Sequence, residues 1–457
     1  MRMTWLGVVL MCVVACGPTD TGEADDGGAN LPGQDAFIQQ DVYEPPPTPN
    51  AHVKGIVYAP NGRTFTPPLT VMGALVYLTE TPPEPIPPNI TCERCVDVPS
   101  GANFARTDEF GAFDLNVWDG SYILVIQKGQ FRLVRTLVVG PDQTFEIPPE
   151  DTTLPSRNSS DGNDAIPRIA LLAGSYDKLE DLFAKMGLAT LSGTSVAWDS
   201  ETQFDVFDNG GNTPPSTSPN FKGDALALLT NPTLMSTYHI IFVPCSAVNN
   251  DVLTEPTLSQ VRQNVKEYVK AGGKYYVADW SYDYLRQIYK TPEDGPVVHF
   301  DGDDGAMLGS SNSASLSHGG SFNSLGHALD EDLYKWLEAQ SVGWGGDNLE
   351  LKENWDWVMS LEEGYIGEDP ENGPQYAKAN VIVEGPHEEG VSWKTLPQEQ
   401  IFPLTLGYPS GCGRVLYTTY HTVGEMGTGH TGIEIQERIL IYLIMEIGVC
   451  QSGPILE

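Results

Sequence analysis

The sequence predicts a multidomain chain, a β-sandwich followed by a three-layer α/β domain of flavodoxin-like architecture with a parallel sheet. Three observations lead to this fold class. Short alternating strands fill residues 51–141, near-continuous apolar strands alternate with helices over residues 167–450, and a polar, proline-containing linker at 142–166 separates the two patterns. With 40% apolar residues in 457 positions, the chain can build two sizeable cores.

The first folded region reads as short strands separated by glycine and proline. A turn that joins two strands is expected at Asp119-Gly120. Four motifs mark the strands: V-x-G-x-V from Val53, G-A-x-V from Gly73, T-D-x-x-G-x-F from Thr107 and G-x-Y-x-L from Gly120. Together they resemble the carboxypeptidase regulatory-like, prealbumin-type domain. That resemblance implies a structural or adhesive module and no reaction.

The second folded region alternates strands and helices. Strands are expected at 168–174, 239–245 and 272–278, and again at 413–421, with helices at 258–271 and 434–448. Residues from about 300 to 400 interrupt the alternation, which predicts an insertion on the carboxyl side of the sheet. Ligands and chemistry in open α/β sheets lie at that side.

Residues 1–16, "MRMTWLGVVLMCVVAC", have the composition of a secretory signal. One arginine precedes the apolar run at 5–14, which is too short to cross a bilayer core of about 30 Å. The ending Val-Val-Ala-Cys resembles the lipobox of bacterial lipoproteins, which implies that Cys16 is lipidated and begins the mature chain. Gly17 in the next position implies an outer-membrane lipoprotein of the cell envelope.

Composition limits the partners of this chain. Residues 17–50 carry seven acidic side chains and no basic ones, and we expect them to form a disordered tether. The formal charge of −36 repels phosphate backbones and anionic lipids, which excludes nucleic acid as a partner. The partners left are the membrane, reached through the lipid anchor, and a glycan or peptide ligand or another envelope protein.

Three segments resemble the class I glutamine amidotransferase-like superfamily, including its trehalose-utilisation-protein-like branch. They are "YHIIFVPCS", "YVKAGGKYYVADWSYD" and the late "GRVLYTTYHTVGE" before a long apolar helix. Catalytic members have a cysteine in a glycine-rich elbow after the central strand, and a histidine and an acid late in the domain. His421 and Glu425 match the late pair, but Asp279-Trp280-Ser281 supplies neither cysteine nor glycine. Because a bulky Trp280 disfavours a strained elbow, the resemblance implies a domain without cysteine-based catalysis.

The turn after strand 272–278 allows three interpretations. Asp279 and Ser281 cap a helix that begins near Tyr282, or they bind a polar ligand, or they are catalytic, with Asp279 as a general base or Ser281 as a nucleophile polarised by His421. In the third case Glu425 or Asp283 would orient the imidazole, whereas otherwise His421 is a hydrogen-bonded histidine at a strand end. The leading function is non-catalytic binding or assembly, and the alternative is a hydrolase acting on a carbohydrate or amide. Burial of all three groups, or a separation from His421 above about 8 Å, would exclude the hydrolase.

The cysteines predict local disulfides and no metal site. Cys92 and Cys95 are expected to pair, and so are Cys412 and Cys450, since a strand start and the end of the returning helix meet at one edge of the sheet. Cys245 then remains as an inert core thiol. No cofactor is expected, and Trp336, Trp355 and Trp357 either pack onto the domain or stack on a sugar or peptide.

Overall fold

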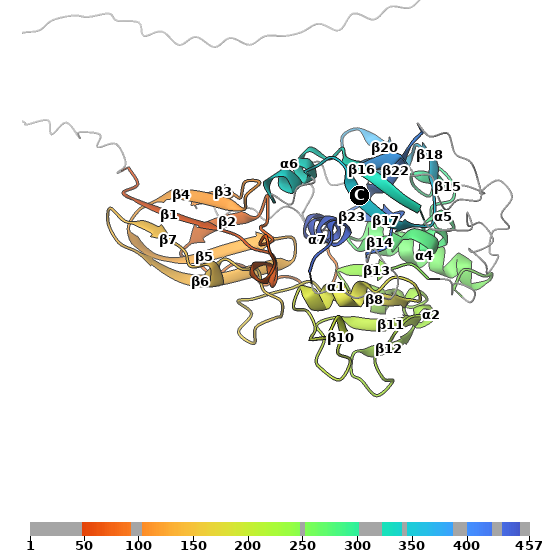
Figure 1. Cartoon of the computed structure of the whole chain (residues 1–457), viewed down its shortest axis with the longest axis horizontal. Coiled ribbons are helices and arrows are strands. Elements are labelled where there is room, and N and C mark those ends of the chain that lie inside the picture. Colours follow the sequence, from red (N-terminus) through yellow and green to blue (C-terminus); the bar gives the residue numbers. More distant parts are fainter. Residues whose placement is uncertain are drawn as a thin grey trace, which may run out of the picture. The chain divides into compact units, whose positions relative to one another are not determined.

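The computed structural model describes residues 48–92, 103–246, 252–300, 322–340, 345–386, 400–422 and 432–447. Residues 48–457 form one compact unit. Small, largely antiparallel sheets come first and a mixed, largely parallel ten-stranded sheet follows, so the predicted multidomain fold class is confirmed (Figure 1). Cys16 and the tether up to residue 47 lie outside the described residues.

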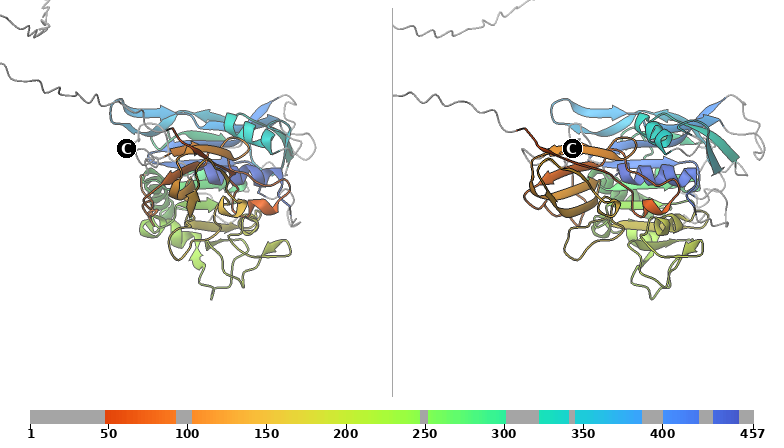
Figure 2. Two further views of the ribbon diagram at one scale, coloured as in Figure 1. Left: turned by 90° about the vertical axis from the view of Figure 1, so that its left-hand side faces the viewer. Right: turned by 60° about the vertical axis from the view of Figure 1, so that its left-hand side comes forward.

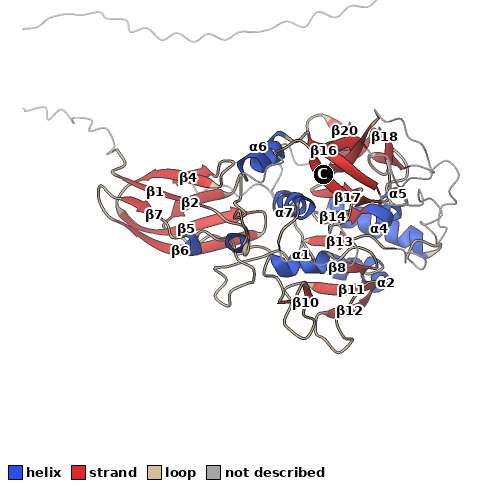
Figure 3. Cartoon of the chain, in the orientation of Figure 1, coloured by secondary structure: helices blue, strands red, loops and turns tan. Residues whose placement is uncertain are grey.

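Two small sheets form the N-terminal sandwich. The three-stranded sheet has the order β4-β1-β7 and the four-stranded sheet the order β3-β2-β5-β6 (Figure 3). Alternate residues of both sheets, such as Val53 and Leu124, are buried in one shared core, as the period of a strand requires. The strands are β1 (Ala51–Ile56), β2 (Leu75–Thr79), β3 (Asn103–Arg106), β4 (Ala112–Val117), β5 (Gly120–Lys128), β6 (Phe131–Val139) and β7 (Thr144–Glu146).

The large sheet has the strand order β12-β11-β8-β13-β14-β23-β22-β21-β16-β17. Its first six strands are mutually parallel. They are β12 (Phe221–Asp224), β11 (Asp205–Asn209), β8 (Ile169–Gly174), β13 (Ile240–Val243), β14 (Lys274–Ala278) and β23 (Gly413–Thr418). The other four are added antiparallel: β22 (Ile401–Ser410), β21 (Asn380–Pro386), β16 (Phe322–Ala328) and β17 (Leu349–Asn354).

The expected insertion at about 300–400 therefore does not stand apart from the sheet. β22 and β23 form a tight hairpin, with Ser410 opposite Gly413, and this hairpin aligns the inserted strands with the edge of the parallel block. Two smaller two-stranded antiparallel sheets, β15 (Val297–Phe300) with β18 (Val358–Glu362) and β19 (Gly364–Asp369) with β20 (Gly373–Ala377), contact β22. Residues 301–321 and 387–399 lie outside the described part of the chain.

Helices cover both faces of the large sheet, which gives the three layers (Figure 2). Along β8, Ile169 and Leu171 belong to one core with α1, α6 and α7, whereas Ala170 and Leu172 belong to a second core with α2, α4 and α5. The helices are α1 (Leu179–Lys185), α2 (Ala225–Leu229), α3 (Pro232–Met235), α4 (Thr257–Lys270), α5 (Asp283–Arg286), α6 (Glu331–Ala339) and α7 (Ile435–Ile447). Within the described residues, no helix is long and apolar enough to span a bilayer.

A segment of the loop after β2, residues 84–92, runs along the amino-terminal edge of the large sheet. We call it the crossing segment. Ile90 N–H donates to Ser236 O at 2.9 Å, and the backbone of Thr91 lies so close to Gly272 (φ 113°) that a Cβ there would be 2.1 Å from Thr91 O. The crossing segment ends at Cys92, which forms a disulfide with Cys412, just before β23 (Cα–Cα 5.1 Å).

This bond corrects both predicted cysteine pairs. Cys412 does lie at the amino-terminal edge of the sheet, as expected, but its partner is Cys92 of the sandwich loop and not Cys450. Sequence spacing alone favours disulfides between neighbouring cysteines. Here the crossing segment brings Cys92, which is distant in sequence, to the start of β23. Cys95 and Cys450 lie outside the described residues.

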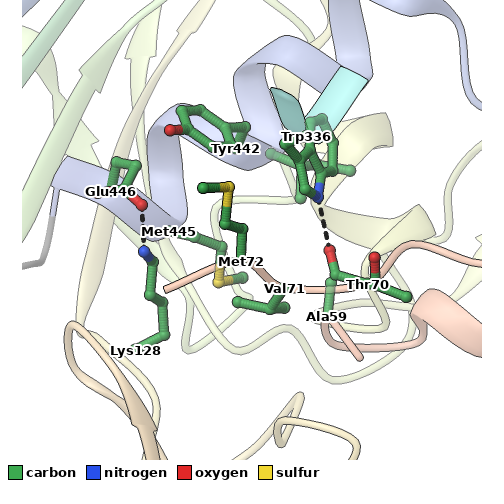
Figure 4. Close-up of a pocket in the computed structure, with 10 residues that line it drawn as sticks. Ala59, Thr70, Val71, Met72, Lys128, Trp336, Tyr442, Met445 and Glu446 are labelled. Atoms are coloured by element: carbon green, nitrogen blue, oxygen red, sulfur yellow. Dashed lines mark hydrogen bonds and ion pairs between the residues drawn. The ribbon is translucent and has the colours of Figure 1, made fainter. Parts of the chain in front are cut away.

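Side chains of β5, α6 and α7 join the sandwich to the α/β domain (Figure 4). Lys128 forms an ion pair with Glu446, and Trp336 Nε1 donates to Thr70 O at 2.9 Å. The cavity between them holds about 10 Å³, room for at most one water molecule. Trp336 is therefore a packing residue and this cavity is not a ligand site.

Candidate functional site

Three chemically active side chains meet at the carboxyl ends of adjacent strands. Cys245 follows β13, Asp279 follows β14 and His421 follows β23, and these strands are neighbours in the sheet. One ligand atom from each lies within 4.8 Å of the other two, and His421 Nε2 is 3.0 Å from Asp279 Oδ2. All three side chains are at most 1% exposed. The prediction thus located Asp279 and His421 but missed Cys245. Functional side chains in open α/β sheets lie at the carboxyl ends of strands, and this strand-end rule, applied to β13, would have found Cys245.

The backbone at Asp279 has the strained geometry of an elbow. Its φ is 48°, in the left-handed region, where aspartate is tolerated better than most residues. Tyr417 OH donates to Asp279 O at 3.2 Å, and Trp355 N–H donates to Asp279 Oδ1 at 3.0 Å. The expectation that Trp280 would prevent an elbow was wrong, because the Trp280 ring packs between Tyr176 and Trp355.

Ser281 is held in a structural hydrogen bond. Its Oγ donates to Pro244 O at 2.7 Å, and the residue is fully buried. Neither Asp279 nor Ser281 caps a helix, since no side-chain cap bond forms at the 3-10 turn Asp279–Tyr282 or at α5. Asp283 pairs with Arg286 at 2.7 Å, and Glu425 lies outside the described residues. Asp279, Ser281 and His421 are all buried, so a substrate cannot reach them. This excludes the predicted hydrolase that would use these three residues.

His421 is held through its backbone and not through its ring. Gln436 Nε2 donates to His421 O at 2.6 Å. The next residue, Thr422, donates from N to Asp177 Oδ1 at 3.1 Å and from Oγ1 to Asp177 Oδ2 at 2.8 Å. Within the described part of the chain, neither ring nitrogen has a hydrogen-bond partner, which corrects the expectation of a hydrogen-bonded imidazole.

Burial dominates the electrostatics of this site. It raises the pKa of Asp279 well above the usual range, and the carboxylates of Asp356 and Asp177 raise it further. Burial also raises the pKa of the Cys245 thiol and lowers the pKa of His421. Without a ligand, the three groups therefore favour their neutral forms.

An aromatic cluster lies on the same strand ends. Tyr176 follows β8, Trp280 follows β14 and Trp355 follows β17. The Tyr176 and Trp280 centroids are 5.6 Å apart and those of Trp280 and Trp355 are 5.0 Å apart, both in edge-to-face geometry. Tyr176 is 36% exposed and both tryptophans are half-buried, so we call these three residues the aromatic platform.

The aromatic platform begins at a topological switch point of the sheet. β11 and β13 flank β8 on opposite sides, and ligands in open α/β sheets bind where the strand order reverses in this way. Trp355 Nε1 donates to Glu353 Oε2 at 3.0 Å, which places an acceptor beside the rings. Of the tryptophans singled out in the sequence, Trp355 contributes an accessible ring, whereas Trp336 and Trp357 are buried packing residues.

Comparisons with solved structures give distant likenesses. The Cytoplasmic Protein STM3548 from Salmonella typhimurium matches at 10% identity and TM-score 0.29, over 62% of this chain and 100% of its own. The Cytoplasmic Protein STM1381 from Salmonella typhimurium LT2 matches at 10% identity and TM-score 0.29, over 61% and 99%. A catalytic mutant of Gan42B, a GH42 beta-galactosidase from G. stearothermophilus, matches at 14% identity and TM-score 0.22, over 62% of this chain and 30% of its own. No family model and no curated protein matches the sequence, and likeness at this level carries no information on ligand or activity.

Proposed function

We propose that the chain is a lipid-anchored protein of the cell envelope whose α/β domain binds a glycan on the aromatic platform without cleaving it. The observation that carries this proposal is the contact between three partly exposed rings at strand ends, beginning with Tyr176 at the switch point of the sheet. Ligand sites in proteins combine aromatic surface with a few polar groups in this way.

The chemistry of the platform favours a neutral sugar. Aromatic rings offer a flat apolar surface to the C–H face of a sugar ring, and the Glu353 carboxylate accepts hydrogen bonds from hydroxyl groups. A formal charge of −36 disfavours anionic ligands. Binding without hydrolysis follows from the burial of Asp279 and His421 and from the Ser281 bond to Pro244.

The rest of the proposal is supported by sequence resemblance. The lipobox-like ending at Cys16 supports an anchor in the outer membrane, and the strand motifs of the sandwich support a carboxypeptidase regulatory-like module. The segments around Asp279 and His421 support an amidotransferase-like domain that lacks the elbow cysteine.

The test is a glycan array with the purified chain, followed by titration of the best ligand. Replacing one platform ring, by Tyr176→Ala or Trp355→Ala, should weaken binding at least 5–10-fold, since one stacked ring contributes about 1 kcal/mol or more. Trp118→Ala is the matched control, because Trp118 is 38% exposed but lies on the sandwich. Equal losses in all three variants would contradict the platform, and release of reducing sugar by the native chain would contradict the non-catalytic role.

A further inference from the structure

We propose that Cys245, Asp279 and His421 form a binding site for a divalent transition-metal ion of the zinc class. The ligand atoms would be Cys245 Sγ, an Asp279 carboxylate oxygen and a His421 ring nitrogen. This site goes beyond the glycan-binding function proposed above and does not depend on it. It lies at the carboxyl ends of β13, β14 and β23, three neighbouring strands of the rigid sheet.

The spacing of the donor atoms suits a small coordination sphere. Zinc bonds of about 2.0–2.3 Å at tetrahedral angles separate two ligand atoms by roughly 3.3–3.7 Å. The three donor atoms lie within 4.8 Å of one another, and His421 Nε2 is 3.0 Å from Asp279 Oδ2. Small side-chain rotations would place all three around one ion.

The donor chemistry selects the class of ion. A thiolate and an imidazole bind zinc and its neighbours in the transition series, whereas magnesium and calcium require oxygen ligands. One sulfur, one nitrogen and one oxygen donor leave a single tetrahedral position for a water molecule. The set therefore points to zinc, cobalt or a related ion and away from the alkaline earths.

Unpartnered polar atoms supply a second, independent observation. Within the described residues, Asp279 Oδ2 and both ring nitrogens of His421 have no well-aligned hydrogen bond, although the two side chains are at most 1% exposed and the Cys245 thiol contacts the Asp279 carboxyl. The 3.0 Å contact between Asp279 and His421 is close but is not aligned as a hydrogen bond. A buried polar atom without a partner typically costs about 1–3 kcal/mol. A bound cation would satisfy the lone pairs of both side chains.

The local charge balance also calls for a cation. Two carboxylates lie around the site: Tyr417 OH is 3.2 Å from both Asp279 O and Asp356 Oδ2, and Asp177 binds Thr422 beside His421. Asp177 and Asp356 are themselves buried, at 0% and 2% exposure. A divalent ion bound to Asp279 would let that carboxylate ionise beside these two acidic side chains, because the ion offsets the added negative charge.

Neighbouring residues already orient the three ligands. Trp355 N–H occupies Asp279 Oδ1 and leaves Oδ2 available. Asp177 holds Thr422, and Gln436 holds the carbonyl group of His421, so the backbone beside the imidazole is fixed. The backbone N–H of Trp280 contacts the Cys245 thiol. Such outer partners are typical of metal sites, where they fix the direction of each ligand.

The decisive experiment uses cobalt as a spectroscopic probe. In the full chain carrying Cys12→Ser, Cys16→Ser, Cys95→Ser and Cys450→Ser, Cys245 is the one thiol of the seven cysteines outside the Cys92–Cys412 bond. Refolding this chain from denaturant without reductant, in the presence of Co²⁺, should give one bound equivalent. Its near-ultraviolet spectrum should contain a thiolate-to-cobalt charge-transfer band. Absence of that band from the folded chain would overturn the proposal.

Ligand variants separate this site from adventitious binding. Cys245→Ser should abolish the charge-transfer band, and Asp279→Asn or His421→Gln should weaken zinc binding by at least 100-fold, more than is typical of outer partners. Ser281→Ala and His239→Gln are matched controls, because both remove a buried polar side chain without removing a proposed ligand. Both controls should keep one equivalent.

Persistence of tight binding in Cys245→Ser and His421→Gln would contradict the assignment, and so would equal loss in the two controls. Circular dichroism of the metal-free variants confirms that each is folded. If Cys245→Ser does not fold, Cys245→Ala provides an apolar replacement. Even without a folded Cys245 variant, the cobalt spectrum of the chain that keeps Cys245 shows whether its thiolate is a ligand.

Discussion

His239 is a buried histidine whose two ring nitrogens both form hydrogen bonds. Its Nδ1 accepts the Arg168 N–H at 2.9 Å, so its Nε2 carries the proton and donates to Pro87 O of the crossing segment at 3.0 Å. Burial lowers the pKa of His239 to about 4, below the 6.5 of a free histidine. The unfolded chain therefore takes up a proton before the folded one does. The contribution of His239 to stability is complete above pH 6.5 and is lost as the pH falls toward 4.

The pH dependence of unfolding should reveal this histidine. Between pH 7.5 and 4.5 the native chain should lose about 2–3 kcal/mol more unfolding free energy than His239→Gln, which has no imidazole to titrate. Urea unfolding at a series of pH values measures the difference. Parallel curves for the native chain and His239→Gln would contradict the role of His239.

Residue roles at strand ends were predictable in part. The strand-end rule located Asp279 and His421, but the roles proposed for Ser281 depended on whether its Oγ was free, and the bond to Pro244 depends on a neighbouring strand. The sequence predicts that Cys245 is a core thiol, because the apolar strand β13 precedes it. Its polar neighbours come from β14 and β23, and only the order of the strands in the sheet shows this.

At the scale of elements, α1 and α7 are joined by a buried ion pair. Lys185 Nζ lies 2.6 Å from Glu437 Oε1, and the two side chains are 2% and 1% exposed. Glu437 Oε2 also accepts the N–H of Glu434 at the start of α7. The cost of removing both charges from water offsets most of their attraction. The ion pair therefore adds little to the free energy of unfolding, and its main effect is to fix how α1 contacts α7.

A double-mutant cycle tests this view of the pair. Lys185→Met alone should cost about 3–5 kcal/mol of unfolding free energy, because it leaves a buried carboxylate without its partner. Lys185→Met combined with Glu437→Leu should bring stability back to within about 1–2 kcal/mol of the native chain, since apolar side chains of similar size fill the space. Urea unfolding gives both values. A double variant no more stable than Lys185→Met would show that the pair stabilises the fold by itself.

Element types and boundaries followed closely from periodicity, whereas contacts between distant segments did not. The predicted helix at 258–271 is α4, Thr257–Lys270, and the strand at 168–174 is β8, Ile169–Gly174. Apolar spacing specifies such elements because each must bury one face. It does not specify that the insertion adds three strands to the sheet by way of the antiparallel strand β22, nor that the crossing segment reaches Gly272. Both depend on tertiary packing.

At the scale of the whole molecule, the proposed anchor makes a simple prediction. Cys16→Ser should release the chain from membranes, since no described helix is able to span a bilayer and the net charge of −36 opposes binding to anionic lipids. Fractionation of cells followed by a high-salt wash measures the distribution. Retention of Cys16→Ser in washed membranes would show that another part of the chain holds it there.

The Cys92–Cys412 bond also constrains the order of events during biosynthesis. The two cysteines are separated by 320 positions. At about 5–20 residues per second, roughly 16–64 s pass between the emergence of the first thiol and the second. Throughout that interval Cys95, three positions away, is already available to Cys92. The native bond therefore competes with a local Cys92–Cys95 bond. In an oxidising compartment without a thiol isomerase, we expect faster oxidation to trap more of the chain with the local bond.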